Sequence, residues 1–408
     1  MWLHPVLERL VRKGTLTVRD WNGRKRRYGD AGSGPSVTIA ITDPAADRRI
    51  FLNPYLALGE AYMDGSLIVE EGDIADLLEL LCSNMGSDLA TGHPLHRALR
   101  QLRRAYRRLQ QSNPVARSRQ NVAHHYDLSG DLYELFLDSD RQYSCAYFEQ
   151  ENDSLERAQE QKKRHIAAKL LLEPEMRVLD IGCGWGGMAI YLARECKARV
   201  TGITLSREQA DYAARRVAEE GLSDRIAIRL QDYREIKGPF DRIVSVGMFE
   251  HVGVYQYDTY MRANRALLGY DGIALLHHIA RATEPGTANP WMAKYIFPGS
   301  YCPALSEVMP AVERAGLYLT DLEIWRLHYA KTLRHWRQRF TGAWETAARL
   351  YDDRFCRMWD FYLAASEMAF RFGGHIVAQF QMSPNQAAVP LTRDYIGEFK
   401  ASHPVGAN

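Results

Sequence analysis

The second half of the chain alternates apolar, strand-like segments with helical ones, and this alternation restricts the fold more than any other feature. Apolar strands separated by helices are typical of a parallel sheet covered on both faces. The sequence therefore predicts an α/β fold, in which ligands bind beyond the carboxyl ends of the strands. The predicted strands are RVLDIG (177–182), RVTGITL (199–205), IAIRLQD (226–232), DRIVSVG (241–247) and GIALLHHIA (272–280).

A glycine-rich loop, VLDIGCGWGG, contains the end of the first predicted strand and leads into a helix. Gly182, Gly184 and Gly186 would let the backbone approach a ligand closely, and Asp180 can anchor the turn. With Gly187 the loop also matches G-x-G-x-x-G, but no acidic residue ends the second strand, as a nicotinamide site would require. S-adenosylmethionine, a cofactor without phosphate, is the better prediction, and a loop without a ligand is the remaining alternative.

An acidic residue and two histidines lie at the ends of neighbouring predicted strands. Glu250 follows the fourth strand, and His277 and His278 close the fifth. A single such residue is usually an ordinary loop residue, but two at adjacent strand ends beside a cofactor loop favour a site. Glu250 and His277 are therefore expected to lie close together. A general base is needed where methylation produces a cation that must lose a proton.

Length and composition predict several domains and exclude some functions. The chain of 408 residues allows two or three domains. A net charge of +2 predicts no strong attraction to nucleic acid, and six separated cysteines without a C-x-x-C pair argue against a zinc site and fit a reducing compartment. The N-terminus is charged too early for a signal peptide, and no apolar run approaches the ~18 residues of a spanning helix. We expect a cytoplasmic protein without a metal ion.

The predicted organisation contains one strongly basic segment. We predict a small α+β module associated with lipid or membrane over 1–92, a basic amphipathic helix and linker over 93–120, a catalytic domain over 121–395 and a tail over 396–408. Segment 93–120 contains eight arginines and no acidic residue. It either binds an anionic membrane peripherally or docks within the protein with its arginines in water. Its helical stripe is formed by Leu95, Leu99, Leu102, Tyr106 and Leu109.

Six motifs occur in order within about residues 120–385: NVAHHYDLSGDLYELFLDSDRQYSCAYF (121–148), VLDIGCGWGG, GITLSREQ, VGMFEHVG, YIFPG (295–299) and HYAKTLRHWRQRF (328–340). Together they resemble the cyclopropane-fatty-acyl-phospholipid synthases, relatives of mycolic acid cyclopropane synthases. The resemblance implies a Rossmann-like class I S-adenosylmethionine-dependent methyltransferase domain with helical lid insertions, acting as a homodimer. It also implies methyl transfer to the cis double bond of unsaturated phospholipids, followed by ring closure.

The resemblance also implies roles for individual residues. Bicarbonate would act as the general base, with His251 only structural. The ligands of bicarbonate would be Cys145, Glu250, His277, Tyr329 and the backbone of Ile279. The cofactor would contact Tyr143, Ser144, Gly182, Gly184, Gly186, Thr204, Leu205 and Gln209, with Asp232 and Tyr233 near its adenine. Aromatic faces that could stabilise the intermediate cation belong to Tyr143, Tyr295, Phe297 and Tyr301.

Two long aromatic helices are predicted between the strands LYLTDLEIW (317–325) and HIVAQFQ (375–381). They are either a packed core or the walls of an acyl-chain tunnel. The first carries Leu333, Trp336, Phe340, Trp344, Ala347 and Tyr351, and the second carries Phe355, Met358, Trp359, Tyr362, Leu363 and Phe370.

Three other functions remain open. A closely related enzyme would leave a methylene or methyl-branched chain, and a non-catalytic lipid-binding protein would keep only the fold. A nucleic-acid methyltransferase is suggested only by NPW (289–291), which resembles an N-P-P-Y loop but comes too late in the chain.

Overall fold

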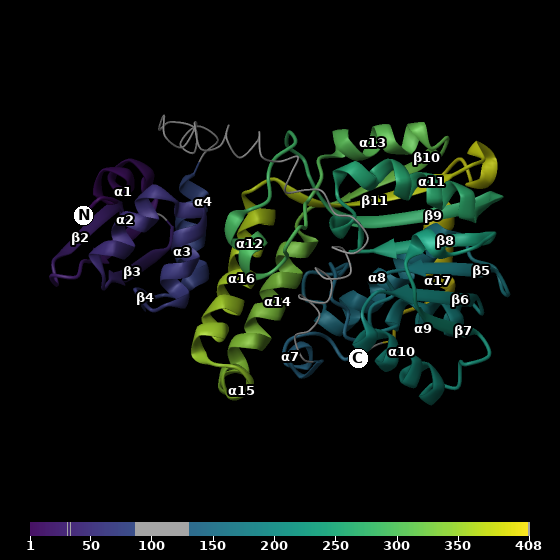
Figure 1. The fold of residues 1–408 in the computed structure, drawn as a ribbon, viewed down its shortest axis with the longest axis horizontal. Coiled ribbons are helices and arrows are strands. Elements are labelled where there is room, and N and C mark those ends of the chain that lie inside the picture. The colour runs from purple at the N-terminus through teal and green to yellow at the C-terminus, as the bar shows by residue number, and fades with distance from the viewer. Residues whose placement is uncertain (31, 33, 86–129, 407–408) are drawn as a thin grey trace. The chain divides into compact units, whose positions relative to one another are not determined.

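The computed structural model describes residues 1–30, 32, 34–85 and 130–406, which form two compact units (Figure 1). The predicted arginine-rich segment 93–120 lies outside the described residues. Among the described residues, the first unit contains 1–85, Thr287–Pro298 and Leu333–Gly374. The second contains 130–286, Gly299–Thr332 and 375–406. Two segments from the range predicted for the catalytic domain therefore pack with the N-terminal residues.

The second unit is built on a seven-stranded sheet with the order β10-β11-β9-β8-β5-β6-β7. The five strands predicted between residues 177 and 280 are all present, and neighbouring pairs among them are parallel. The predicted parallel sheet is confirmed for these five strands, whereas β11 runs antiparallel to both β9 and β10. The strands are β5 (Arg177–Ile181), β6 (Arg199–Thr204), β7 (Ile226–Leu230), β8 (Phe240–Val246), β9 (Leu268–Arg281), β10 (Tyr318–Trp325) and β11 (His375–Ser383).

Helices cover both faces of this sheet, and each face has its own apolar core. One core includes Met261 and Val308 from the helices α11 and α13. The other includes Ile166 and Leu192 from α8 and α9, together with Val217 of α10. The α-helices are α7 (Gly130–Glu134), α8 (Leu155–Leu170), α9 (Gly187–Glu195), α10 (Arg207–Glu219), α11 (Tyr257–Leu267), α13 (Leu305–Arg314) and α17 (Asp394–Ser402). Short 3-10 helices are η2 (Tyr233–Glu235), η3 (Phe249–His251), η4 (Val254–Gln256) and η5 (Gln386–Ala388).

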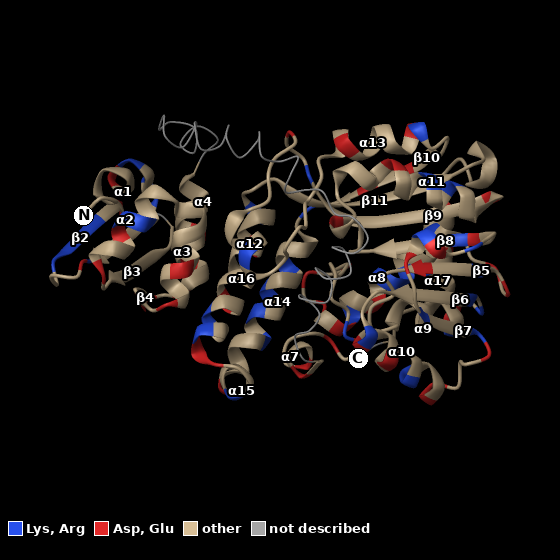
Figure 2. Cartoon of the chain, viewed as in Figure 1, with Lys and Arg blue, Asp and Glu red and all other residues tan. Residues whose placement is uncertain are grey.

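The N-terminal part of the first unit is the predicted α+β module. Its four-stranded sheet has the order β2-β1-β3-β4, with β1 and β3 parallel. The edge strand β2 exposes three consecutive basic residues, Lys25 to Arg27 (Figure 2), and charge on an edge strand discourages pairing with other chains. The elements are α1 (His4–Leu10), β1 (Gly14–Arg19), β2 (Lys25–Asp30), β3 (Ser36–Ile41), α2 (Pro44–Leu52), α3 (Pro54–Met63), β4 (Leu67–Glu71) and α4 (Ile74–Asn84).

The first unit is completed by helices from later in the chain. Two aromatic helices were predicted here, but the structure has three, because the first is interrupted at Ala343. Trp336, Phe340 and Trp359 on these helices are fully buried. The backbone of α3 is close to this aromatic core, since a Cβ at Gly59 would lie 2.5 Å from the indole nitrogen of Trp291. The helices are α12 (Pro290–Tyr295), α14 (His328–Gly342), which begins in the second unit, α15 (Trp344–Leu350) and α16 (Asp353–Arg371).

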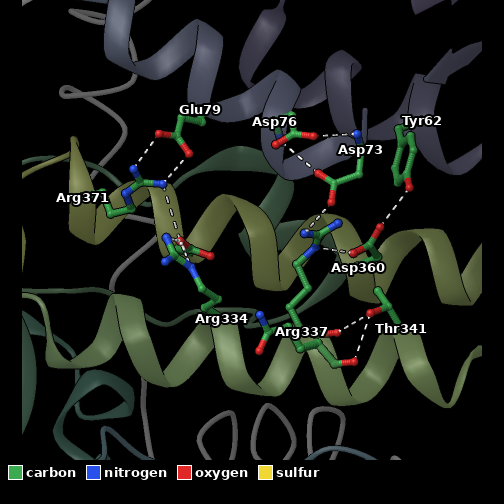
Figure 3. Close-up of polar contacts among 11 residues, drawn as sticks. Tyr62, Asp73, Asp76, Glu79, Arg334, Arg337, Thr341, Asp360 and Arg371 are labelled. Carbon is green, nitrogen blue, oxygen red and sulfur yellow. Dashed lines mark hydrogen bonds and ion pairs between the residues drawn. The ribbon is translucent and has the colours of Figure 1, made fainter. Parts of the chain in front are cut away.

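Ion pairs join α14 and α16 to the N-terminal module inside this unit (Figure 3). The guanidinium of Arg337 donates to Asp360 at 2.7 Å and to Asp73 at 3.0 Å. Asp360 also accepts a hydrogen bond from the Tyr62 hydroxyl at 2.9 Å. Because Asp360 is nearly buried, its charge depends on these partners. A second pair links Arg371 of α16 to Glu79 of α4, with both contacts at 2.6 Å.

Candidate functional site

A cavity opens at the carboxyl ends of β5, β6 and β8 in the second unit. Its volume is ≈ 1220 Å³, including the open mouth. All predicted cofactor residues except Gly186 line it: Tyr143, Ser144, Asp180, Gly182, Gly184, Thr204, Leu205, Gln209, Asp232 and Tyr233. Parallel sheets of this kind bind ligands at this edge.

The glycine-rich loop requires glycine for its conformation. Gly182 has a φ of 85° and Gly184 a φ of 53°, in the left-handed region that other residues avoid. Gly186 precedes α9 with a φ of 86°, and a Cβ there would lie 3.0 Å from Ala213. This residue therefore serves the turn and the packing of α10 against the loop.

Asp180, at the end of β5, is the most unusual polar group of the cavity. Its side chain is buried, and its Oδ2 atom has no hydrogen-bond partner among the described residues. Burial raises the pKa of Asp180 to about 7. An unpaired buried acceptor is costly, so it fits a ligand that donates a hydrogen bond, such as a hydroxyl group.

Other polar groups of the cavity are already held by neighbours. The Thr204 hydroxyl donates to Gln209 at 2.9 Å. Arg234 binds the Asp232 carboxylate with two hydrogen bonds, of 2.8 and 2.6 Å. Arg234 lines the cavity, and sequence reasoning missed it, although its position just after the third strand was a usable signal. Also missed were Arg141, Gln142, Ile181, Cys183, Trp185, Met188, Ile203, Gln231, Val246, Gly247, Met248 and Val252.

His251 was predicted to be only structural, yet it lines the cavity. Burial lowers its pKa to about 4, so the ring is neutral at physiological pH.

Glu250, the residue before His251, is buried with one of its two carboxylate oxygens hydrogen-bonded. One carboxylate oxygen of Glu250 accepts a hydrogen bond from the backbone amide of Ile279 at 2.6 Å. The other oxygen, Oε2, is buried without a partner among the described residues, and burial raises the pKa of Glu250 to about 7.

His277 lies on β9, two residues before Ile279, whose backbone amide binds Glu250. The His277 ring is buried, and its centroid lies 4.9 Å from that of the Trp325 ring. Its Nδ1 atom lies 3.0 Å from the side-chain nitrogen of Gln379. Burial lowers the pKa of His277, which favours the neutral ring. His278 points to the other face of β9, where it contacts Phe249 at 5.0 Å.

Cys145 is also buried, and it directly follows Tyr143 and Ser144, which line the cavity. Burial raises the pKa of its thiol, so it is not an activated nucleophile. The next residue, Ala146, donates its amide to the Thr332 hydroxyl at 3.0 Å. Tyr329 is one turn before Thr332 on α14 and therefore shares its side of the helix.

The four aromatic residues proposed to face a cation are divided between the units. Tyr143 lines the cavity, and the amide of Tyr301 donates to the Glu250 carbonyl at 3.0 Å. In the first unit, the Tyr295 hydroxyl bonds Glu60 at 2.9 Å and Phe297 packs on Tyr362 at 5.8 Å.

The NPW segment has a local structural role. The Asn289 side chain caps α12 by accepting hydrogen bonds from the amides of Trp291 and Met292, and Trp291 is buried. This capping explains the motif without nucleic acid. In the part of the chain that the structure describes, no helix combines the length and apolar character needed to span a bilayer.

The sheet order and the cavity at the glycine-rich loop define a class I S-adenosylmethionine-dependent methyltransferase fold. The chain belongs to the mycolic acid cyclopropane synthetase family, whose model matches residues 114–380. A second family, described as a domain of unknown function, matches residues 3–92. The predicted family is thereby confirmed, and the protein is a C-methyltransferase of the cyclopropane synthase type.

Individual relatives agree with this family. The chain is 40% identical over 342 residues to the cyclopropane-fatty-acyl-phospholipid synthase of Escherichia coli K12, covering 83% of this chain and 86% of the relative. It is 35% identical over 365 residues to a probable fatty acid methyltransferase of Pseudomonas putida, covering 88% and 89%. The mycolic acid cyclopropane synthase CmaA1, solved with SAH and CTAB, has a TM-score of 0.62 and 33% identity, covering 66% of this chain and 99% of that one.

Proposed function

We propose that the protein transfers a methyl group from S-adenosylmethionine to the cis double bond of an unsaturated phospholipid acyl chain and closes a cyclopropane ring. One observation carries the proposal: the predicted cofactor residues line one cavity, and Glu250 joins the adjacent strand end beside His277. The name of the Escherichia coli synthase supports the ring and the phospholipid substrate, and the name of CmaA1 supports the formation of a ring.

The residues of the cavity fit the proposed cofactor. S-adenosylmethionine, when bound, supplies the methyl group from its sulfonium. Asp180 offers an unpaired acceptor for a ribose hydroxyl, and the loop containing Gly182 and Gly184 leaves the backbone accessible. An alkene is a poor nucleophile, so the protein must position it and keep water from the cation.

Bicarbonate remains our proposal for the general base. Glu250 Oε2 is a buried acceptor without a described partner, which suits a small anion that carries a hydroxyl group. The neutral His277 ring and the Cys145 thiol would add hydrogen bonds, with Tyr329 as a further ligand. The Ile279 amide would have to be shared, because Glu250 already accepts its hydrogen bond at 2.6 Å.

We also propose that the protein acts as a homodimer at the inner face of an anionic membrane. The lipid substrate and the basic segment 93–120 support a peripheral association from the cytoplasm. Sedimentation in the presence and absence of vesicles would test both points, and a monomer that never co-sediments with lipid would contradict them.

The decisive experiment is mass spectrometry of phospholipids after incubation with the protein and S-adenosylmethionine. We expect unsaturated chains to gain one CH₂, while phospholipids with the same head group and saturated chains remain unchanged. NMR must then show ring protons. If SAH binds but no lipid gains mass, the protein is a non-catalytic lipid-binding protein or methylates another substrate.

One alternative has specific support. The Pseudomonas putida relative is named a probable fatty acid methyltransferase, which does not specify a ring. A methylene-branched product has the same mass as a cyclopropane, because both add a methyl group and lose one proton. Vinylidene protons in place of ring protons would establish this alternative. A saturated methyl branch would further require a reductant.

A further inference from the structure

Lys162 on α8 is a fully buried lysine beside the cofactor cavity. Its ammonium group donates hydrogen bonds to the Gln142 side chain at 2.6 Å and to the Ser144 hydroxyl at 2.8 Å. Both acceptors are neutral, and no ion pair joins Lys162 to a carboxylate among the described residues. Lysine is rarely buried without a paired charge, so this position calls for a specific role.

Both acceptors of Lys162 line the cofactor cavity. The same helix holds their backbone as well: the Gln159 side chain donates to the carbonyl of Gln142 at 3.2 Å and to that of Ser144 at 3.0 Å. Four hydrogen bonds from α8 therefore fix the segment 142–144, which presents Tyr143 to the cavity. Cys145 follows directly.

The charge of Lys162 also reaches the proposed oxyanion ligands. It adds to the lowering of the His277 pKa, and it opposes the rise of the Cys145 pKa that burial causes. Burial lowers the pKa of Lys162 itself to about 7, against the attraction of Asp138. Lys162 thus acts on the cofactor cavity through its hydrogen bonds and on the pKa values of His277 and Cys145 through its charge.

We propose that Lys162 is a positioning residue that holds the segment 142–145 in the arrangement required for binding the cofactor. The identity of that cofactor rests on the proposed function. Replacement by methionine keeps most of the side-chain volume but removes both hydrogen bonds, so the segment should lose its fixed position.

A matched control is available on the same helix. Lys169 is also fully buried, but it pairs with Asp321 at 2.8 Å and Glu323 at 3.0 Å on β10. It does not line the cavity. Lys169→Met should lower thermal stability strongly, because two carboxylates lose a buried partner. It should not change the affinity for SAH.

Calorimetric titration with SAH tests the inference independently of lipid turnover. We expect Lys162→Met to raise the Kd for SAH about tenfold or more, as loss of hydrogen bonds from a charged group implies, and Lys169→Met to leave it within about twofold. Ser144→Ala and Gln142→Met each remove one acceptor and should also weaken binding. The Lys162→Met and Gln142→Met effects should not add, since they share one interaction.

An unchanged Kd in folded Lys162→Met would overturn the inference. If that variant does not fold, unchanged affinities in both acceptor variants would do so. The inference and the proposed function fail separately: wild-type protein that binds SAH but forms no cyclopropane contradicts only the function, and normal turnover with normal SAH affinity in Lys162→Met contradicts only the role of Lys162.

Discussion

The carboxylate of Glu250 accepts a hydrogen bond from the backbone amide of Ile279 at 2.6 Å. This contact ties the 3-10 helix after β8 to the end of β9, and it places an acidic side chain beside the strand that carries His277. One carboxylate oxygen is thereby used, while the other is buried without a described partner. Among the described residues, this oxygen is therefore a buried acceptor that is open to a hydrogen bond.

Replacement of Glu250 by glutamine should impair chemistry and spare cofactor binding. Glutamine can still accept the Ile279 hydrogen bond but cannot hold a negative charge. We expect turnover to fall about 100-fold, the usual contribution of acid–base machinery, with the Kd for SAH unchanged because Glu250 does not line the cavity. Calorimetry and lipid mass spectrometry measure the two effects. Loss of SAH binding would show that the assigned role is wrong.

The same variant should change how stability depends on pH. Burial raises the pKa of Glu250 from 4.5 to about 7, so the folded protein keeps a proton that the unfolded chain releases. The resulting stabilisation is complete below pH 4.5 and is lost as the pH rises through 7. The thermal midpoint of Glu250→Gln should therefore rise relative to wild type between about pH 5 and 8. A constant difference across this range would contradict the buried ionisation.

Asp180→Asn should separate stability from binding. The buried Asp180 oxygen has no described partner, and burial raises its pKa to about 7. Removing the charge should stabilise the protein above that pH by about 1–3 kcal/mol, the cost of an unsatisfied buried group. It should also weaken SAH binding about tenfold, since a charged acceptor is lost. Differential scanning fluorimetry and calorimetry would check both, and unchanged affinity would remove Asp180 from the cofactor site.

Arg337→Met should destabilise the first unit. Asp360, with 5% of its side chain exposed, would lose its cation, and breaking a buried pair costs about 3–5 kcal/mol. Arg354→Met is the control, because the Arg354–Asp64 pair is exposed at 48% and 42% and should contribute about 0–1 kcal/mol. Urea unfolding followed by tryptophan fluorescence would compare them. Equal effects would mean that burial does not determine the strength of these pairs.

Charge reversal in the basic segment should weaken membrane binding. The triple replacement of Arg100, Arg104 and Arg108 by glutamate should reduce affinity for anionic vesicles by tenfold or more, since each basic residue contributes about 1 kcal/mol near such a surface. Added salt should have the same effect on wild type. Vesicle sedimentation measures this, with neutral vesicles as the control. An unchanged affinity would leave these arginines as a solvated face.

Sequence patterns predicted the five strands between residues 177 and 280 because apolar runs and helical periodicity depend on local chemistry. The direction of β11 could not be predicted in this way, since the pattern of apolar and polar residues along a strand does not say whether its neighbours run parallel or antiparallel to it. Lys162 was missed for a related reason: a lysine on a helix is ordinarily exposed, and its acceptors lie on a different segment. Trp336 and Trp359 were predicted to belong to a packed core or to the walls of a tunnel. The packing of their helices with the N-terminal module could not be predicted, because it depends on contacts between residues distant in sequence.

The composition of the first unit has a consequence for cleavage of the chain. Residues 1–85 pack in one unit with α14 and α16, which follow more than two hundred positions later. An engineered protease site between residues 85 and 130 should therefore yield a nicked protein whose two fragments co-purify, held by non-covalent complementation alone. The ion pairs of Arg337 with Asp73 and of Arg371 with Glu79 should contribute to this association.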